Sequence, residues 1–479
     1  MTFLPRSISL LIAVLVALVG SGARAADKTT AVVGGTLIHP ERPGAPAEKD
    51  VTVIFSGDRI QAVGPSKSTP VPKGAKVIEA KGKWILPGMI DSHVHFFQSG
   101  DPFTRPDAVD ATTIVPYAKE VERNKARLPA TFKVWLASGV TSVADVGGPF
   151  WNFDARDAAK KSPAAPRVAV AGPLTSMVDR PALDLGDPPI IKITSPEAAR
   201  ELAKKELARK PDFLKVWFIH QKGDDLAAQE AIVKATGDAA HEAGIRLAVH
   251  ATELDVAKSA LRAGADVLVH SVNDKPVDAE FLEMAKARKV LYVPTLFVRD
   301  GYRLVIYGGW KSTEPEKRLA DPQILAQMDA IEKAPKEKLS PKLAERRAKG
   351  PPQQTRRFDM ENLRPVWDAG ITVAMGTDAG NVGTLHGPSI FREMQMMRDA
   401  GLTMPEILLS ATVNGAKTMG MERDIGTVEP GKLADLIILD ADPLANVDNL
   451  SHVYRTVKGG VVFNPTDLMR SIRQGQGRR

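Results

Sequence analysis

The sequence predicts an α/β fold, a (β/α)8 TIM-type barrel with a small β-sandwich domain built from both chain ends. Three observations lead to this prediction. The chain has 479 residues, which is too long for one ordinary compact domain. Short β-type runs bounded by turn residues lie near both ends, whereas β-rich runs alternate with helical stretches between them. Eight such strand–helix units over about 300 residues match the number and size expected of a barrel.

The composition is that of a globular chain. Apolar residues make up 43% and charged residues 25%, which excludes collagen-like, wholly disordered and polytopic membrane classes. The formal net charge is +7, but the basic residues are scattered and aromatic residues are few, so no nucleic-acid partner is expected. Cysteine is absent, which excludes disulfides, thiolate metal sites and a cysteine nucleophile. Any metal chemistry must therefore come from His, Asp, Glu or Lys.

Residues 1–25 are typical of a signal peptide. Arg6 precedes an apolar run over residues 10–19, and small residues follow up to Ala25, so we expect cleavage near Ala25/Ala26. The alternative is an uncleaved membrane anchor, but this run is shorter than the about 20 apolar residues that span a bilayer. We therefore expect a periplasmic or secreted protein with no stable membrane span after processing.

The predicted β domain combines residues 26–83 with residues 422–479. Its short runs suggest an antiparallel layer, and neither end is long enough to bury a good core alone, so we expect the two ends to pair. The candidate strands are residues 31–33, 51–55, 60–63, 434–439, 453–457 and 459–463.

The predicted barrel spans residues 84–421. Its candidate strands are residues 84–96, 140–146, 167–171, 213–218, 247–250, 267–272, 290–297 and 372–378. Helical stretches between them include residues 195–208, 227–243, 254–263 and 278–287. A charged, helix-prone insertion at about 300–360 follows the seventh strand, at the rim where barrel active sites lie. It could form a lid or substrate wall, or instead a solvated excursion or an oligomer contact.

The most informative motif is His93-Val94-His95, at the end of the first candidate strand of the barrel. Side chains alternate faces along a strand, so both imidazoles project the same way and could bind one metal ion. Taken alone, the pair could equally be a polar sheet surface. However, His250, His270 and Asp378 also end apolar β runs. All five residues converge on one rim if the barrel forms.

These residues and their surroundings resemble the amidohydrolase superfamily of metal-dependent hydrolases. The resemblance is strongest to exported members similar to imidazolonepropionases, Xaa-Pro-type dipeptidases and ochratoxinase. It covers nearly the whole chain after the signal peptide, and the motifs that carry it are residues 87–95, 138–142, 376–378 and 426–436.

Lys215, within the apolar run 213–217, bears on the number of metals. A lysine in such a strand is usually an edge residue whose amine reaches water. In a barrel wall, its ammonium would instead face metal ligands, where like charges oppose. An anionic carbamate formed with CO2 would remove this conflict, and its two oxygens could bridge two cations. The family has such a lysine on its fourth strand, so the resemblance implies two metals joined by carboxylated Lys215.

The resemblance also implies the ligand set and the chemistry. The buried metal would be held by His93, His95 and Asp378, the outer metal by His250 and His270, and both by Lys215. Zn2+ is the first expectation, with Mn2+, Co2+ or Fe2+ also suited to these ligands. Two divalent metal ions would make a metal-bridging hydroxide available at ordinary pH. Asp378 would then be the catalytic base and pass the proton to the departing nitrogen, so Asp378 and Lys215 are the expected catalytic residues.

Other histidines have weaker indications. His220 and His386 follow the fourth and eighth candidate strands, so either could contact substrate on the catalytic rim. His241, late in a helical stretch, is expected to be structural, and His39 and His452 of the β domain are expected to lie at the surface.

The leading hypothesis is a binuclear metal-dependent amidohydrolase, such as a dipeptidase, that cuts amide bonds of small peptide-like or N-acyl amino acid substrates. The alternative is a cyclic amidohydrolase, a lactonase or a mononuclear deaminase of the same superfamily. A catalytically silent binding protein is a remote alternative, since all six ligand positions are filled. The expected partner is a small-molecule amide or peptide, and a homo-oligomer stays open.

Overall fold

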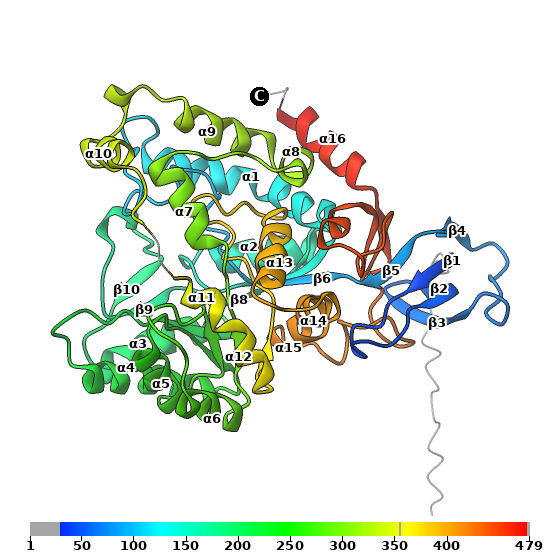
Figure 1. Cartoon of the computed structure of the whole chain (residues 1–479), viewed down its shortest axis with the longest axis horizontal. Coiled ribbons are helices and arrows are strands. Elements are labelled where there is room, and N and C mark those ends of the chain that lie inside the picture. The colour runs from blue at the N-terminus through cyan, green and yellow to red at the C-terminus, as the bar shows by residue number, and fades with distance from the viewer. Residues whose placement is uncertain (1–28, 354–355, 477–479) are drawn as a thin grey trace, which may run out of the picture.

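The computed structural model describes residues 29–353 and 356–476 (Figure 1). The predicted signal peptide, residues 1–25, lies outside the described residues. Within the described ranges, no helix combines the length and apolarity needed to cross a membrane.

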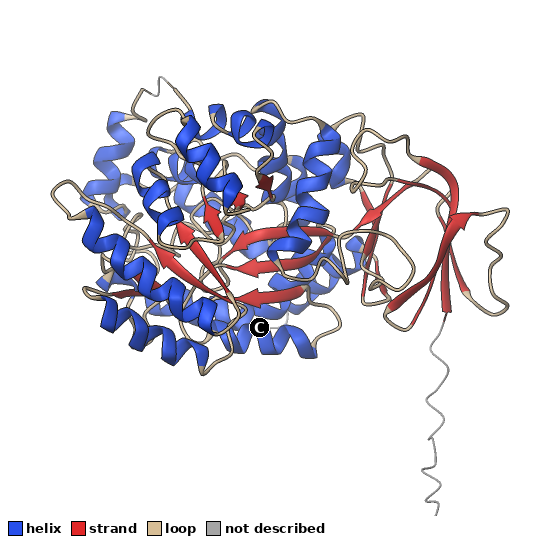
Figure 2. Ribbon diagram, turned by 90° about the horizontal axis from the view of Figure 1, so that it is seen from below, coloured by secondary structure: helices blue, strands red, loops and turns tan. Residues whose placement is uncertain are grey.

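Both chain ends contribute to one eight-stranded sheet beside the barrel (Figures 1 and 2). The pairing of β5 with β16 joins the ends, with Leu86 opposite Ile437, so the predicted pairing of the two ends is confirmed. The sheet is mixed rather than antiparallel, because β1 pairs in parallel with β4 and β5. The strands are β1 (Thr29–Leu37), β2 (Glu48–Ser56), β3 (Arg59–Pro65), β4 (Lys76–Glu79), β5 (Trp84–Pro87), β16 (Leu436–Leu439), β17 (Val453–Lys458) and β18 (Val461–Phe463).

The core of this β domain follows from alternation along its strands. Val51, Val53 and Phe55 occupy alternate positions of β2 and pack together with Leu436 and Ile438 from the other chain end. Both ends thus contribute to a core that neither could bury alone.

The barrel consists of two arcs of parallel strands surrounded by helices (Figure 2). Backbone hydrogen bonds from Asp212 N to Val170 O (2.9 Å) and from Ser92 N to Met375 O (2.9 Å) connect the arcs, so the barrel closes. The first arc is β6 (Met89–Val94), β7 (Val140–Asp145) and β8 (Arg167–Val170). The second is β11 (Phe213–Trp217), β12 (Arg246–His250), β13 (Val267–Val269), β14 (Leu291–Val293) and β15 (Thr372–Val373).

Two features of the strands differ from the sequence prediction. The predicted first strand, residues 84–96, is wrong, because the chain leaves the mixed sheet after β5 and enters the barrel as β6. Gly88 marks the change: a Cβ there would lie 2.2 Å from Thr141 Oγ1, so the chains approach too closely for a side chain. In addition, β9 (Leu174–Ser176) and β10 (Ile190–Lys192), which were not predicted, extend the second arc beyond β11.

The helices around the barrel begin at recognisable capping residues. Ser195 accepts from Ala198 N ahead of α3, and Asp278 accepts from Phe281 N ahead of α6, as N-cap side chains do. At the C-terminal end, α16 packs against α1. These helices are α1 (Tyr117–Ala137), α2 (Asn152–Lys161), α3 (Pro196–Leu207), α4 (Leu226–Glu242), α5 (Leu254–Arg262), α6 (Ala279–Ala287), α13 (Ser389–Asp399), α14 (Met404–Leu409), α15 (Gly415–Thr418) and α16 (Pro465–Gln476).

The charged segment after β14 is helical, as expected. It forms α7 (Val298–Tyr307), α8 (Glu314–Leu319), α9 (Pro322–Glu332), α10 (Pro341–Lys349), α11 (Phe358–Glu361) and α12 (Leu363–Asp368). Helices α7, α9 and α10 share a small apolar core that includes Val305, Ile324, Met328 and Leu343. Short 3-10 turns lie at Pro181–Leu183, Lys336–Lys338 and Val447–Ser451, and a π-helical turn at Ser410–Asn414.

Candidate metal centre

A cavity of about 270 Å³ lies at the carboxyl ends of the barrel strands. Three of the predicted ligands lie on the strands β6, β11 and β12, and a fourth directly follows β6. The other two lie in the turns after β13 and β15. All six side chains predicted as metal ligands line this cavity: His93, His95, Lys215, His250, His270 and Asp378.

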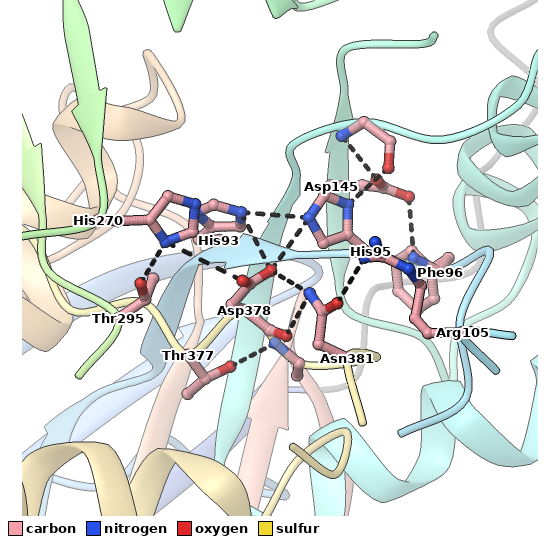
Figure 3. A network of polar contacts seen from close by, with 12 residues as sticks. His93, His95, Phe96, Arg105, Asp145, His270, Thr295, Thr377, Asp378 and Asn381 are labelled. Atoms are coloured by element: carbon pink, nitrogen blue, oxygen red, sulfur yellow. Dashed lines mark hydrogen bonds and ion pairs between the residues drawn. The ribbon is translucent and has the colours of Figure 1, made fainter. Parts of the chain in front are cut away.

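Three ligand atoms converge on one point (Figure 3). His93 Nε2 lies 3.2 Å from His95 Nε2, and Asp378 Oδ1 lies 3.3 Å and 3.0 Å from these two nitrogens. Atoms bound about 2.0–2.1 Å from a tetrahedral zinc ion are about 3.3 Å from each other. The spacing of the three side chains therefore fits a divalent metal.

Two more imidazoles, those of His250 and His270, lie close to these three side chains. His270 Nδ1 is 4.0 Å from Asp378 Oδ2 and 2.6 Å from Thr295 Oγ1. The ring centroids of His250 and His270 are 4.4 Å apart, and those of His93 and His270 are 4.9 Å apart. His93, His270 and Asp378 can all offer ligand atoms within 4.8 Å of one another. The four imidazoles and Asp378 thus form one continuous cluster, with Oδ1 of Asp378 nearest His93 and His95 and Oδ2 near His270.

Lys215 is enclosed in the same cavity. Its side chain is 2% exposed, and Nζ has no hydrogen-bond partner among the described residues. Burial lowers the pKa of the amine to about 7, although the Asp378 carboxylate acts in the opposite direction. A buried amine of this kind is readily neutral, which is the form that reacts with CO2.

The protonation states suit metal binding. Burial lowers the pKa of His93 to about 4 and lowers the pKa values of His250 and His270 well below their usual range. Neutral imidazole is the form that binds a metal. Burial alone would raise the pKa of Asp378, but the adjacent His93 and His95 hold it well below its usual range, so the carboxylate stays ionised.

The backbone is strained at three residues of the site. Asp378, His270 and Thr295 have φ values of 61°, 72° and 47°, in the left-handed region that disfavours residues other than glycine. Each such residue costs on the order of 1 kcal/mol, and such strain is typical of functional sites. The turns after β13, β14 and β15 are therefore held in conformations that aim these side chains at the cavity.

Asp91, which sequence reasoning missed, connects β6 to the turn that carries Asp378. Its carboxylate accepts from Thr377 Oγ1 (2.6 Å), Thr377 N (3.0 Å) and His93 N (3.1 Å). Burial raises the pKa of Asp91 to about 7. The signal was present in the sequence, because Asp91 stands two positions before His93 on the same face of the strand.

Asp145, also missed, organises the loop behind His95. It accepts from Asn152 Nδ2 (2.6 Å) and Gly147 N (3.2 Å), while Gly147 O lies 2.6 Å from His95 Nδ1. A proton on Nδ1 of His95 would be bonded to this carbonyl and leave Nε2 as the acceptor that faces His93 and Asp378. Asp145 ends the second strand of the barrel, where a polar residue is a detectable signal.

The cavity wall has an apolar part and a polar part. Phe97, Leu174, Ile190 and Trp217 form an apolar part, and β9 and β10 supply two of these residues. Polar lining side chains that sequence reasoning did not find include Arg105, Asn273, Arg299, Tyr302 and Asn381. The insertion contributes to the wall through α7, which carries Arg299 and Tyr302.

The two predicted substrate-contacting histidines do not reach this wall. His220 Nδ1 pairs with Gln229 Oε1 at 2.8 Å, and His386 is buried with Nε2 2.9 Å from Gln98 O and its ring stacked on Phe96. Neither is among the described residues that line the cavity. Their positions just after barrel strands suggested exposure at the rim, but both side chains pack into neighbouring structure instead.

The remaining histidines have separate environments. His241 pairs with Asp266 at 2.8 Å near the end of α4. His39 lies 2.9 Å from Glu41 in the β domain, and His452 is exposed.

The fold and the site together define a class, a β/α-barrel hydrolase with a candidate centre for divalent metal. The amidohydrolase family model matches residues 84–463. The chain therefore belongs to the amidohydrolase family.

Individual relatives match over most of their length. The chain is 27% identical over 446 residues to an imidazolonepropionase of Sphingopyxis alaskensis, covering 90% of this chain and 92% of that protein. It is similar to the structure of A. niger ochratoxinase, with a TM-score of 0.68 and 20% identity over 92% of this chain and 96% of that one. It is also similar to a Xaa-Pro dipeptidase with bound methionine in the active site, with a TM-score of 0.65 and 21% identity over 91% of this chain and 100% of that one. The two structures show the shared fold.

Proposed function

We propose that the protein is a binuclear metal-dependent amidohydrolase that hydrolyses amide bonds of small peptide-like or N-acyl amino acid substrates. The observation that carries this proposal is the buried amine of Lys215, which has no hydrogen-bond partner among residues 29–353 and 356–476 and shares a cavity with four histidines and Asp378. An amine left as ammonium there would face the metal ligands without a partner of its own. A modified lysine that serves as a ligand accounts for its position.

Each ligand has a role in this proposal. His93, His95 and Asp378 would hold one metal, and His250 and His270 the other. The neutral amine of Lys215 would add to the carbon of CO2 and lose a proton, which yields an anionic carbamate shared by both metals. Zn2+ suits this set of imidazole and oxygen ligands.

Two bound divalent cations would lower the pKa of water and polarise the substrate carbonyl. The protein supplies the proton transfer. Asp378 directs Oδ1 toward the His93 and His95 nitrogens, so Oδ2, on the side of His270, can take a proton from water. The same carboxyl group would then deliver this proton to the departing nitrogen. No covalent bond between substrate and protein is needed.

The cavity walls support a small amide as substrate. Leu174, Ile190 and Trp217 suit an apolar substituent. Arg299 suits an anionic group because its side chain is 46% exposed and its ion pair with Asp359 is long, at 3.9 Å. The similarity to a dipeptidase that holds methionine in its active site supports the same substrate class. The predicted signal peptide adds a periplasmic or secreted location to the proposal.

A second candidate is hydrolysis of a cyclic amide. The relatives named imidazolonepropionase, which match over most of the chain, favour it. Lys215 weighs against a mononuclear centre, so the number of metals per chain separates a binuclear amidase from the mononuclear alternatives.

The test combines metal analysis with activity. Wild-type protein, Lys215→Ala and the exposed-lysine control Lys342→Ala would be analysed for metal content and screened on dipeptides, N-acyl amino acids, cyclic amides and lactones. We expect two metals per chain, loss of activity with a chelator, and recovery with Zn2+ and bicarbonate. Lys215→Ala should lose metal and activity, with partial rescue by short carboxylic acids. One metal per chain with activity confined to cyclic amides would favour the second candidate, and full activity of Lys215→Ala would overturn the carbamate.

A further inference from the structure

A short chain of hydrogen bonds leads from the cavity wall to Asp378 (Figure 3). Asn381 Nδ2 donates to Asp378 Oδ1 at 2.6 Å. Asn381 Oδ1 accepts from Tyr302 Oη at 2.6 Å and from Arg105 Nη1 at 3.1 Å. Asn381 is 4% exposed, so these bonds are protected from water.

The chemistry of the partners fixes the orientation of this amide. A guanidinium has only donors, so the Asn381 atom that faces Arg105 must be the carbonyl oxygen. The NH2 group must then face Asp378, an ionised carboxylate that only accepts. Rotating the amide by 180° would set donor against donor and oxygen against oxygen. Asn381 therefore has one stable orientation.

Arg105 is oriented by an ion pair with Asp107. Its Nε and Nη2 donate to the two carboxylate oxygens of Asp107 at 2.8 and 2.7 Å, which leaves Nη1 for Asn381. This bidentate pair fixes the plane of the guanidinium. The loop between β6 and α1 thus delivers one donor to Asn381 with little freedom.

Tyr302 is held by the start of its helix. The buried Glu393 on α13 accepts from the backbone nitrogens of Leu296 and Phe297 at 2.8 and 2.9 Å, just ahead of α7. The insertion helix that carries Tyr302 is therefore anchored to the barrel wall.

The fixed orientation of Asn381 distinguishes the two oxygens of Asp378. Oδ1 contacts Asn381 Nδ2 and lies 3.0 to 3.3 Å from the Nε2 atoms of His95 and His93, whereas Oδ2 lies 4.0 Å from His270. A carboxylate free to rotate could exchange its two oxygens. The bond from Asn381 selects one of them for the side of His93 and His95.

We propose that Asn381 is a positioning residue that commits Oδ1 of Asp378 to the metal and leaves Oδ2 to carry the proton, and that Tyr302 and Arg105 act on Asp378 through it. The part played by Oδ2 rests on the proposed function above. A substrate group that contacts Tyr302 or Arg105 is thereby linked to the proton carrier through one side chain.

The test is a double-mutant cycle with Asn381→Ala and Tyr302→Phe. Tyr307→Phe, which removes a hydroxyl from the same helix, is the matched control. Readouts are kcat, KM, and the affinity and visible spectrum of Co2+ bound to the metal-free protein. Loss of a residue that orients a metal ligand typically lowers metal affinity or activity about 10- to 100-fold. We expect Asn381→Ala to lower kcat and Co2+ affinity within this range and to change the Co2+ spectrum, with KM changed less than kcat.

The cycle distinguishes a positioning role from direct contact. Because Tyr302 acts through Asn381, Tyr302→Phe should lower kcat in the wild type and have no further effect in Asn381→Ala. Additive effects would show that Tyr302 acts independently and would overturn its part of the proposal. Unchanged kcat, Co2+ affinity and spectrum in Asn381→Ala would overturn the whole.

Two safeguards keep the result interpretable. If Asn381→Ala does not fold, Tyr302→Phe alone still removes one donor from Asn381 while keeping the ring, and an unchanged kcat and Co2+ spectrum in it would overturn the part of the proposal in which Tyr302 acts on Asp378. Co2+ binding requires no substrate. A Co2+ affinity and spectrum that depend on Asn381 in a protein that hydrolyses no amide would therefore refute the proposed function but support the positioning of Asp378.

Discussion

Replacing Lys215 with methionine should stabilise the metal-free protein at neutral pH. The wild-type amine is 2% exposed and has no hydrogen-bond partner in the described part of the chain. Burial lowers its pKa from the usual 10.5 to about 7, a difference that corresponds to about 5 kcal/mol for burying the charged amine. Methionine is unbranched and apolar, and it fills a similar space without that charge.

The effect should depend on pH in a defined direction. The folded-state pKa of Lys215 lies below the unfolded-state value, so the unfolded chain binds the proton more tightly. Wild-type stability is therefore lowered in full below pH 7 and recovers as the pH rises toward 10.5. The destabilisation should be about 4 kcal/mol at pH 7 and about 1 kcal/mol at pH 10. For a chain of this length, 4 kcal/mol corresponds to a Tm difference of about 4 °C.

The assay is thermal unfolding followed by circular dichroism, on metal-free protein in CO2-free buffers between pH 6 and 10. Lys342→Met replaces an exposed lysine of α10 and should show no such pH-dependent gain. Adding Zn2+ and bicarbonate should reverse the order of wild type and Lys215→Met, because only wild type has the amine that the proposed carbamate requires. Equal Tm values at pH 7, or a difference that does not change with pH, would refute the reasoning.

Three further substitutions test the turn that carries Asp378. Asp378→Asn should lower kcat about 100- to 10,000-fold, the usual contribution of a proton carrier, with KM changed far less; steady-state kinetics with parallel metal analysis would reveal another base if turnover stayed near wild type. Gly380→Ala should lower both Tm and metal content, because φ is 107° and a Cβ would lie 2.3 Å from His95 O. Gly244→Ala is its control, because φ is 73° and no described atom lies within 4 Å of the added carbon. Equal losses of Tm and metal content in the two variants would argue against a specific clash at Gly380. Thr377→Val removes the 2.6 Å bond to buried Asp91 and should lower the free energy of unfolding by about 1–3 kcal/mol, and an unchanged urea midpoint would contradict that role.

The convergence of the candidate ligands on one cavity could be predicted because it depends on local pattern. His93 and His95 share a face of one strand, and His250, His270 and Asp378 each follow an apolar run. In a parallel barrel all such ends meet at one rim, so the approximate location of the cavity follows from the topology. The pairing of the two chain ends was predictable for a similar reason, since neither could bury its apolar face alone.

The break at Gly88 and the added strands β9 and β10 could not be predicted in the same way. Apolar residues stand on both sides of Gly88, at 84–86 and at 89–90, and only the neighbouring strands decide where one sheet ends and the next begins. His386 shows the same limit, because its place just after a barrel strand gives no sign that it stacks on Phe96.

The sequence by itself determined which residue types could bind a metal and on which rim they gather, because strand periodicity and apolar burial act over a few residues. Only the tertiary structure decided how Asp378 is oriented. Its partner Asn381 takes hydrogen bonds from Arg105 and Tyr302, which lie 276 and 79 positions away in the chain. Such bonds form only after the barrel has closed and α7 has packed against it. They depend on distance in space and on the direction of a lone pair, and neither quantity is encoded in the spacing of residues along the chain.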